Sequence, residues 1–194
     1  EYVGPAWYQK EVVIPESWEG KSIELEFERI LWMSSLYIDG KLVNSIKSFS
    51  TAHIYDLSKV LRPGKHRISI CVDNRVGPEF DRWSHAFSEY TQTCWNGIVG
   101  KMELRAYDAV NIKDIQVYPD IEKKQARVVC TIENLTNKEV KGSLSMYATT
   151  TNSSKMHQVK EVNMPFGGSD KMIKAEVVLP MGKDVQLWDE FTPV

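Results

Sequence analysis

Hydrophobic and polar residues alternate along most of this chain with a period of two. The stretch SIELEFE at residues 22–28 is the clearest case, since Ile23, Leu25 and Phe27 share one face and glutamates occupy the other. This pattern predicts a strand of an antiparallel sheet that has one buried and one solvated face. Further strands are expected at 7–14, 66–72 and 98–104, the last with Ile98, Gly100, Met102 and Leu104 on one half-buried face.

Turn signals separate these strands. Asp39-Gly40 stands between LYID and KLV, which predicts a β-hairpin. The best helical candidate, DLSKVLRPG at 56–64, is long enough only for a short turn before Pro63-Gly64. Many short strands without long helices indicate an all-β protein, either a sandwich or a jelly roll.

The pattern restarts near residue 108, which divides the chain into predicted domains at 1–108 and 109–194. The second domain carries five shorter strands, and an immunoglobulin-like sandwich with a possible truncation is expected, because seven strands are usual in that fold. The five stretches are VNIKDIQVYPD (110–120), ARVVCTIEN (126–134), GSLSMYATT (142–150), MHQVKEVNM (156–164) and KMIKAEVVLP (171–180), with Gly167 and Gly168 expected in a loop.

Composition narrows the classes of partner. Among 194 residues, 42% are hydrophobic and 26% are charged, which is ordinary for a globular protein, and the net charge of −2 gives no attraction for nucleic acid or an anionic membrane. No apolar run approaches the roughly 20 residues that span a bilayer. The chain starts with Glu1 instead of Met, so we expect a piece of a longer polypeptide that has lost any export signal.

Metal, cofactor and thiol chemistry have little support. Cys71, Cys94 and Cys130 are too few and scattered for a disulfide framework or a zinc site. The four histidines lack the spacing of metal ligands, so no metal and no cofactor are expected. Acidic residues mostly alternate outward along strands, where a solvated face is the simplest interpretation. Three tryptophans are expected to pack in the core or at sheet edges: Trp7, Trp18 and Trp32.

Residues 74–97 form the most unusual segment. A loop longer than about 12–15 residues without secondary structure is usually functional or disordered, and this one is too aromatic for a disordered linker. The candidate ligand-binding residues, which supply aromatic rings, amides and charged groups, are Asp81, Arg82, Trp83, His85, Gln92, Trp95 and Asn96. The alternative is that the aromatic side chains pack on the protein and meet no ligand.

Several motifs in order resemble glycoside hydrolase family 2, which includes β-galactosidases, β-glucuronidases and β-mannosidases. The opening stretch at 2–30 resembles the start of the family's sugar-binding jelly roll, and IDGKLV at 38–43 resembles its hairpin. The remaining matches are HIYDLSKVLRPGKHRISICVDN (53–74), WNGIVGKMEL (95–104), VNIKDIQVYPD (110–120) and LWDEFTP (187–193). One departure is Thr51-Ala52, where family members often carry Thr-Pro.

The resemblance implies a role without chemistry of its own. Family members carry their catalytic carboxylates on a barrel that follows these two domains, and such a barrel needs about 250 residues. No catalytic residue is therefore expected here. The implied parent hydrolyses β-glycosidic bonds with retention, and its partners are carbohydrate and the downstream barrel. The resemblance also implies that the candidate residues of segment 74–97 are substrate-binding, since aromatic rings contact the C–H faces of sugars while amides and charged groups take their hydroxyls. The family's usual role in polysaccharide breakdown implies a periplasmic or secreted protein.

Two other functions stay open. An autonomous carbohydrate-binding module would bind oligosaccharides without a barrel, since jelly rolls often do. An adhesion-type structural protein would use the sandwiches as spacers and would have no catalytic domain downstream.

Overall fold

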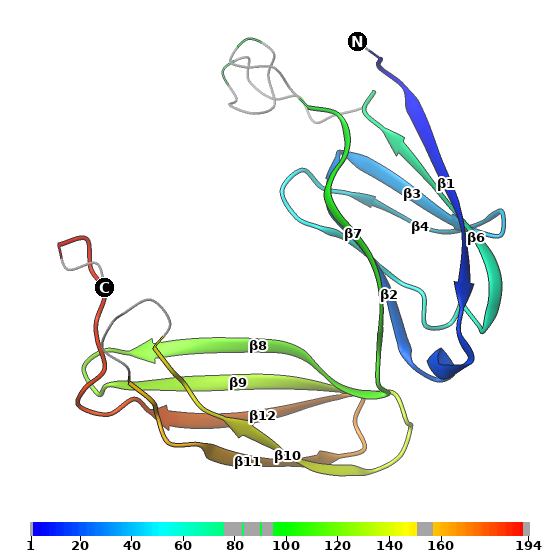
Figure 1. Ribbon diagram of the computed structural model, residues 1–194. Coiled ribbons are helices and arrows are strands. Elements are labelled where there is room, and N and C mark those ends of the chain that lie inside the picture. The colour runs from blue at the N-terminus through cyan, green and yellow to red at the C-terminus, as the bar shows by residue number, and fades with distance from the viewer. Residues whose placement is uncertain (1, 76–82, 84–89, 91–94, 151–156, 192–194) are drawn as a thin grey trace. The chain divides into compact units, whose positions relative to one another are not determined.

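The chain forms two compact all-β units, Glu1–Asp108 and Ala109–Val194. The computed structural model shown in Figure 1 describes residues 2–75, 83, 90, 95–150 and 157–191. Within that part, twelve strands and a short 3-10 helix, η1 (Glu16–Trp18), are present without any α-helix. The prediction of an all-β protein is confirmed.

The first unit contains two antiparallel sheets. The larger sheet has the order β1-β6-β3-β4, and the smaller one has the order β5-β2-β7. The strands are β1 (Pro5–Ile14), β2 (Ser22–Leu31), β3 (Met33–Ile38), β4 (Lys41–Lys47), β5 (His53–Asp56), β6 (Gly64–Asp73) and β7 (Gly97–Tyr107).

The core of the first unit is built by the alternating residues of both sheets. Ile23, Leu25 and Phe27 of β2 are buried, as the pattern predicted, and they cluster with Leu36 of β3 and Ile70 of β6. Burying each such side chain contributes roughly 1.5–3 kcal/mol relative to leaving it in water. The hydrophobic period therefore fixes which face of each sheet turns inward.

The hairpin between β3 and β4 has the geometry that its sequence predicted. Asp39 has φ 51° and Gly40 has φ 81°, so both central residues are left-handed, as a type I′ turn requires. Glycine adopts this conformation without the steric cost of a Cβ atom.

One expectation for β7 is wrong. Ile98 and Leu104 pack against the core, but Met102 is 62% exposed although it lies opposite Phe27. The pairing of β2 with β7 shifts register just after Phe27, and β7 is the edge strand of its sheet. Met102 therefore has a neighbouring strand on one side only, which a period of two cannot reveal.

The three tryptophans occupy the two kinds of place that the sequence predicted. Trp18 packs against the core, and Trp32 is buried with its ring stacked on Phe49 at a centroid distance of 5.2 Å. Trp7 lies on the edge strand β1 with 60% of its surface exposed, and its ring packs on Tyr37.

Residues 109–150 and 157–191 of the second unit form five strands, the number that the sequence predicted. They form a sheet of order β12-β9-β8 and a two-stranded sheet of β10 and β11. The predicted fourth strand is displaced, since β11 includes Gly167 and Gly168, which pair with Lys141 and Val140. The bounds are β8 (Val110–Asp120), β9 (Gln125–Asn134), β10 (Val140–Met146), β11 (Val162–Gly168) and β12 (Met172–Pro180).

The core of the second unit is centred on β9. Val128, Cys130 and Ile132 are buried against Met164 and Ile173. An apolar groove of about 370 Å³ lies between β8, β9 and β10. The two sheets thus enclose one core and leave part of its apolar lining open.

A polar network is buried inside the first unit. The Ser34 hydroxyl lies 2.6 Å from Nδ1 of His53 and 2.6 Å from the Tyr55 hydroxyl. Nε2 of His53 lies 3.2 Å from the carbonyl oxygen of Ser48, which can only accept. Neutral His53 therefore donates from Nε2 and accepts at Nδ1. Burial lowers the pKa of His53, because the charged imidazolium is disfavoured away from water.

This network predicts that the first unit loses stability in acid. Unfolded histidine has a pKa of about 6.5, so below that pH the unfolded chain binds more protons at His53 than the folded chain does. The contribution of His53 to the free energy of unfolding is therefore complete above about pH 6.5 and is lost as the pH falls toward the lowered pKa. In urea unfolding at several pH values, the free energy of unfolding of His53→Gln should fall less steeply with decreasing pH than that of the unsubstituted chain.

His66 provides the matched control. Its hydrogen bond with Asp39, with 2.7 Å between Nδ1 and Oδ2, raises the pKa of His66. Its contribution therefore has the opposite sign: it is present below about pH 6.5 and is lost as the pH rises. His66→Gln should steepen the loss of stability on acidification, and identical pH profiles for both variants would contradict the assignment.

Candidate functional site

Three chain segments meet at one edge of the first unit. β6 ends at Asp73 and β7 begins at Gly97, so the long aromatic segment leaves and returns there. β1 runs antiparallel to β6 with Pro5 opposite Asp73, which brings the first residues of the chain to the same place. Residues 2–8, 72–75 and 95–97 are called the loop edge below.

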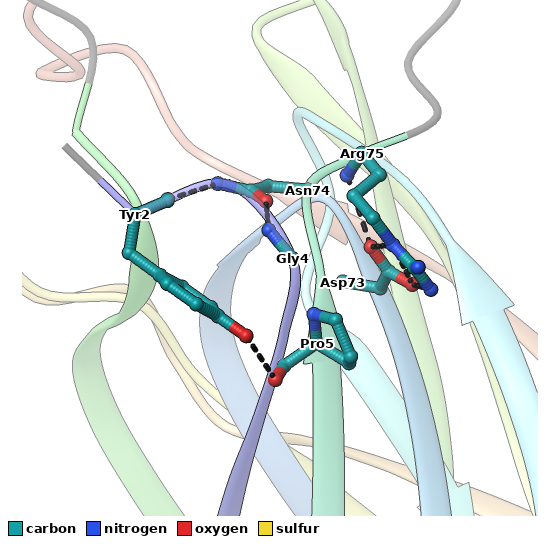
Figure 2. A network of polar contacts seen from close by, with 6 residues as sticks. All are labelled: Tyr2, Gly4, Pro5, Asp73, Asn74 and Arg75. Carbon is teal, nitrogen blue, oxygen red and sulfur yellow. Dashed lines mark hydrogen bonds and ion pairs between the residues drawn. The ribbon is translucent and has the colours of Figure 1, made fainter.

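Asn74 connects all three segments through its side-chain amide, and Figure 2 shows its contacts with Tyr2 and Gly4. Its Oδ1 accepts a hydrogen bond of 2.8 Å from the backbone N–H of Gly4. Its Nδ2 donates to the carbonyl oxygen of Tyr2 at 3.2 Å and to Oδ1 of Asn96 at 2.8 Å. One amide therefore holds the N-terminal segment and both ends of the loop together.

A charged pair lies beside this amide, as Figure 2 shows. Nη2 of Arg75 lies 2.7 Å from Oδ2 of Asp73, and the backbone N–H of Arg75 donates to Oδ1 of Asp73 at 3.0 Å. These hydrogen bonds lower the pKa of Asp73. Its carboxylate stays ionised at neutral pH and serves as an acceptor, whereas a general acid needs a raised pKa.

The loop edge encloses a hollow of about 320 Å³. Gly97 forms part of its wall with φ 88°, and a Cβ atom there would lie 3.1 Å from the Tyr8 hydroxyl. A side chain at this position would be strained and would crowd the tyrosine. The lining residues are Tyr2, Gly4, Ala6, Tyr8, Leu31, Val72, Asn74, Asn96 and Gly97.

Tyr8 presents an aromatic ring and a hydroxyl at the hollow. Its side chain is 46% exposed at the hollow, and its hydroxyl makes no hydrogen bond within the part of the chain that the structure describes. A phenolic hydroxyl can donate one hydrogen bond and accept others. Tyrosine thus offers an aromatic ring and a polar tip to the same ligand.

The structure brings one of the predicted site residues to this hollow. Asn96 lines it and is hydrogen-bonded to Asn74. Trp95 is half-buried next to it in the chain, and Trp83 is 68% exposed, but neither lines the hollow. The other four predictions lie outside the described residues: Asp81, Arg82, His85 and Gln92.

Three residues of the site were missed by the sequence reasoning. Tyr8 was assigned only to the strand at 7–14 and Tyr2 only to the opening motif, while Asn74 was noted as the end of the CVDN motif and the start of segment 74–97 but not as a site residue. An asparagine that ends a strand just before a long loop is a usable signal, because its amide can hydrogen-bond nearby backbone. Its partners near residue 2 could not be inferred, since they are about 70 positions away in the chain.

Where the structure describes carboxyl groups with shifted pKa values, each pKa is lowered, as at Asp39, Asp73, Glu103 and Asp120. Across residues 2–75, 83, 90, 95–150 and 157–191, His, Cys, Asp and Glu form no group that could hold a metal ion. The described helical structure also includes no segment long and apolar enough to cross a membrane.

Two family models match the chain. The model described as glycosyl hydrolases family 2, sugar binding domain, matches residues 1–118, and the model described as glycosyl hydrolases family 2 matches residues 110–194. Together they cover the whole sequence. The order of motifs described above thus agrees with an independent comparison.

Curated relatives are longer proteins. The β-galactosidase of Thermoanaerobacter pseudethanolicus is 21% identical over 142 residues, which is 72% of this chain and 19% of that protein. The β-glucuronidase of Paenibacillus borealis is 24% identical over 149 residues, which is 69% of this chain and 25% of that protein. The chain therefore spans about a quarter or less of these two relatives.

Solved structures show the same fold. The Bacteroides uniformis β-glucuronidase matches 96% of this chain with a TM-score of 0.73 and 18% identity, over 23% of its own length. A β-glycosidase from Bacteroides vulgatus matches 96% with a TM-score of 0.65 and 18% identity, over 22% of its length. Both matches span the two units described here.

The Asn74 contacts predict a stability effect at the loop edge. Asn74→Ala removes three hydrogen bonds, two of them to backbone groups, and should lower the free energy of unfolding by about 1–3 kcal/mol. Asn44→Ala is the control, because Asn44 accepts only from the backbone N–H of adjacent Ser45. Urea unfolding measures both, and equal losses would mean that Asn74 does not tie the segments together.

Proposed function

The chain belongs to glycosyl hydrolase family 2, and from that premise we propose that it is the non-catalytic front part of a β-glycosidase. Residues 1–108 would act as a sugar-binding jelly roll and residues 109–194 as an immunoglobulin-like sandwich. Their role is to support a catalytic barrel supplied by the same polypeptide and to shape the entrance of its substrate pocket. The parent would hydrolyse β-glycosidic bonds with retention through two carboxylates on that barrel.

The observation that carries this proposal is the composition of the loop edge. Tyr2 and Tyr8 offer aromatic surface around the hollow, and Asn74 and Asn96 offer amide groups at its wall. Binding sites for small molecules combine apolar surface with a few fixed polar groups. Here Asn74 holds the side-chain amide of Asn96 and the backbone of Tyr2 and Gly4 in place before any ligand binds, which reduces the entropy that binding must overcome.

The names of the relatives leave the sugar open. β-Galactosidases and β-glucuronidases are both among the similar proteins, and they differ in the charge of the sugar that they accept. The hollow has Asn74 and Asn96 in its lining, with the Asp73–Arg75 pair next to it. We infer that the loop edge contacts hydroxyls common to both sugars and that the barrel selects between them.

The family matches bear differently on the two alternative functions, an adhesion-type structural protein and an autonomous carbohydrate-binding module. The matches to a glycosidase family favour an enzyme part over an adhesion-type spacer. An autonomous carbohydrate-binding module stays compatible with a domain that is described as sugar binding. A periplasmic or secreted location stays a prediction.

The test is steady-state kinetics of the full-length enzyme with the nitrophenyl β-galactoside and β-glucuronide. Tyr8→Phe removes one hydroxyl, and Asn96→Ala removes one amide, so each should raise KM or lower kcat by roughly 2- to 10-fold, the value of one hydrogen bond. Asn44→Ala on β4 is the control and should change neither constant.

Measuring stability beside kinetics separates the loss of a contact with the substrate from a loss of folded structure. Thermal unfolding of each variant accompanies the kinetics, because Asn96 also supports Asn74 through its side chain. Reduced kcat/KM in Tyr8→Phe with an unchanged melting temperature supports contact with the substrate. Unchanged kinetics in both variants would remove the loop edge from the substrate pocket.

A further inference from the structure

The outer face of the β1-β6-β3-β4 sheet carries a second set of aromatic and polar side chains. Successive residues of a strand point to opposite faces, so Ala6 and Tyr8 turn toward the core side and the loop edge, while Trp7, Gln9 and Glu11 turn away. The register extends this outer face across the sheet, since Trp7 pairs with Cys71 and Cys71 pairs with Ser35. The two sides of β1 therefore present two separate surfaces.

An aromatic platform occupies one part of this face. Trp7 is the most exposed element of it, and its ring lies 5.3 Å from the ring of Tyr37 at an interplanar angle of 45°. Tyr37 reaches Trp7 across β6, which lies between β1 and β3. Exposed tryptophan supplies a large apolar surface with a fixed orientation, which suits the C–H face of a sugar ring.

Polar groups that hydrogen-bond one another lie next to the platform. Nε2 of Gln9 donates to the Ser69 hydroxyl at 2.9 Å, and Ser69 pairs with Tyr37 in the ladder. The hydroxyls of Ser35 and Ser45 lie 2.7 Å apart. These contacts hold donors and acceptors in place on a rigid sheet, so little order is lost when a ligand binds.

A polar hollow of about 420 Å³ continues the face beyond Gln9. Glu11 lies in its wall and forms an ion pair with Lys65 at 2.7 Å and a longer one with Arg67 at 3.6 Å. Asp39 accepts from the backbone N–H of Arg67 at 2.8 Å. Nδ1 of His66, which also lines the hollow, lies 2.7 Å from Oδ2 of Asp39. Each of the two carboxylates therefore has a basic side chain beside it, and this balance favours a neutral ligand over a polyanion or a polycation.

The dimensions suit more than one sugar ring. Trp7 and Glu11 are four positions apart on β1, and a strand rises about 3.4 Å per residue, so the platform and the hollow are separated by roughly 13 Å. A ligand that contacts both must be extended along the strand and must carry many hydroxyls. A neutral oligosaccharide has these properties.

We propose that this outer face is a binding surface for a neutral oligosaccharide, with one ring on Trp7 and Tyr37 and the next rings on Gln9, Ser69 and the hollow. The proposal goes beyond the role of the loop edge, because it concerns the opposite side of β1 and needs no barrel. It would also place sugar binding by the first unit at a surface that is separate from the substrate pocket.

The 194-residue chain allows a direct test with cellotetraose and galactotetraose as probes. Titration calorimetry and tryptophan fluorescence should show saturable binding, with glucose and galactose binding more weakly than the tetrasaccharides. Trp7→Ala should weaken binding at least about tenfold, as the loss of an aromatic contact of this kind predicts. Gln9→Ala should weaken it less.

Two variants serve as matched controls. Val13→Ala changes an exposed residue on the same strand and the same face, and Ile54→Ala changes an exposed residue of β5 in the other sheet. Both should bind the tetrasaccharides as the unsubstituted chain does. Thermal unfolding of Trp7→Ala should match that of the unsubstituted chain, because most of this side chain is in solvent.

Three results would overturn the proposal. The first is an absence of saturable binding up to about 10 mM tetrasaccharide, a concentration at which a useful affinity would be visible. The second is binding that Trp7→Ala leaves unchanged and Tyr8→Phe weakens, which would assign the sugar to the loop edge. The third is self-association of the chain that Trp7→Ala abolishes without sugar binding, which would make the face a protein interface. The kinetic test of the loop-edge variants does not depend on the result of this titration, so the two proposals can fail separately.

Discussion

The antiparallel pairing of β1 with β6 is the constraint on which both candidate surfaces depend. Ten residue pairs, from Pro5 opposite Asp73 to Ile14 opposite Gly64, fix the register of the edge strand. That register carries the first residues to the end of β6, where Asn74 can reach them. Alternation along the same strand then sends Tyr8 to one side and Trp7 to the other, because a shift of one residue would exchange their faces.

In the first unit, apolar side chains fill the space between the two sheets, and most polar side chains that bear on function lie at strand ends or on the edge strand. Apolar residues between the sheets provide the driving force for folding. The buried Ser34–His53–Tyr55 network is tolerated because each polar group finds a partner. The polar side chains that bear on function lie instead where strands end or where an edge strand meets solvent, so they can change without disturbing the core.

The sequence pattern predicted those strands and turns that depend on residues close together in the chain. The strand at 22–28, the hairpin at Asp39-Gly40 and the number of strands described in the second unit follow from period and turn chemistry, and the order of the motifs predicted the family. The exposure of Met102 and the extension of β11 through Gly168 did not follow, since each depends on which strand lies alongside. The candidate site was predicted through Asn96, while Tyr2, Tyr8 and Asn74 were missed.

The sequence by itself determined the all-β class, the inward face of most strands and the kinship with a glycosidase family, because hydrophobic period and turn residues act over a few positions. Only the tertiary structure decided that Asn74 holds residues far apart in the chain and that Trp7 shares an outer face with Tyr37. Such contacts depend on strand order and register, which arise when the whole sheet forms and which no local stretch specifies.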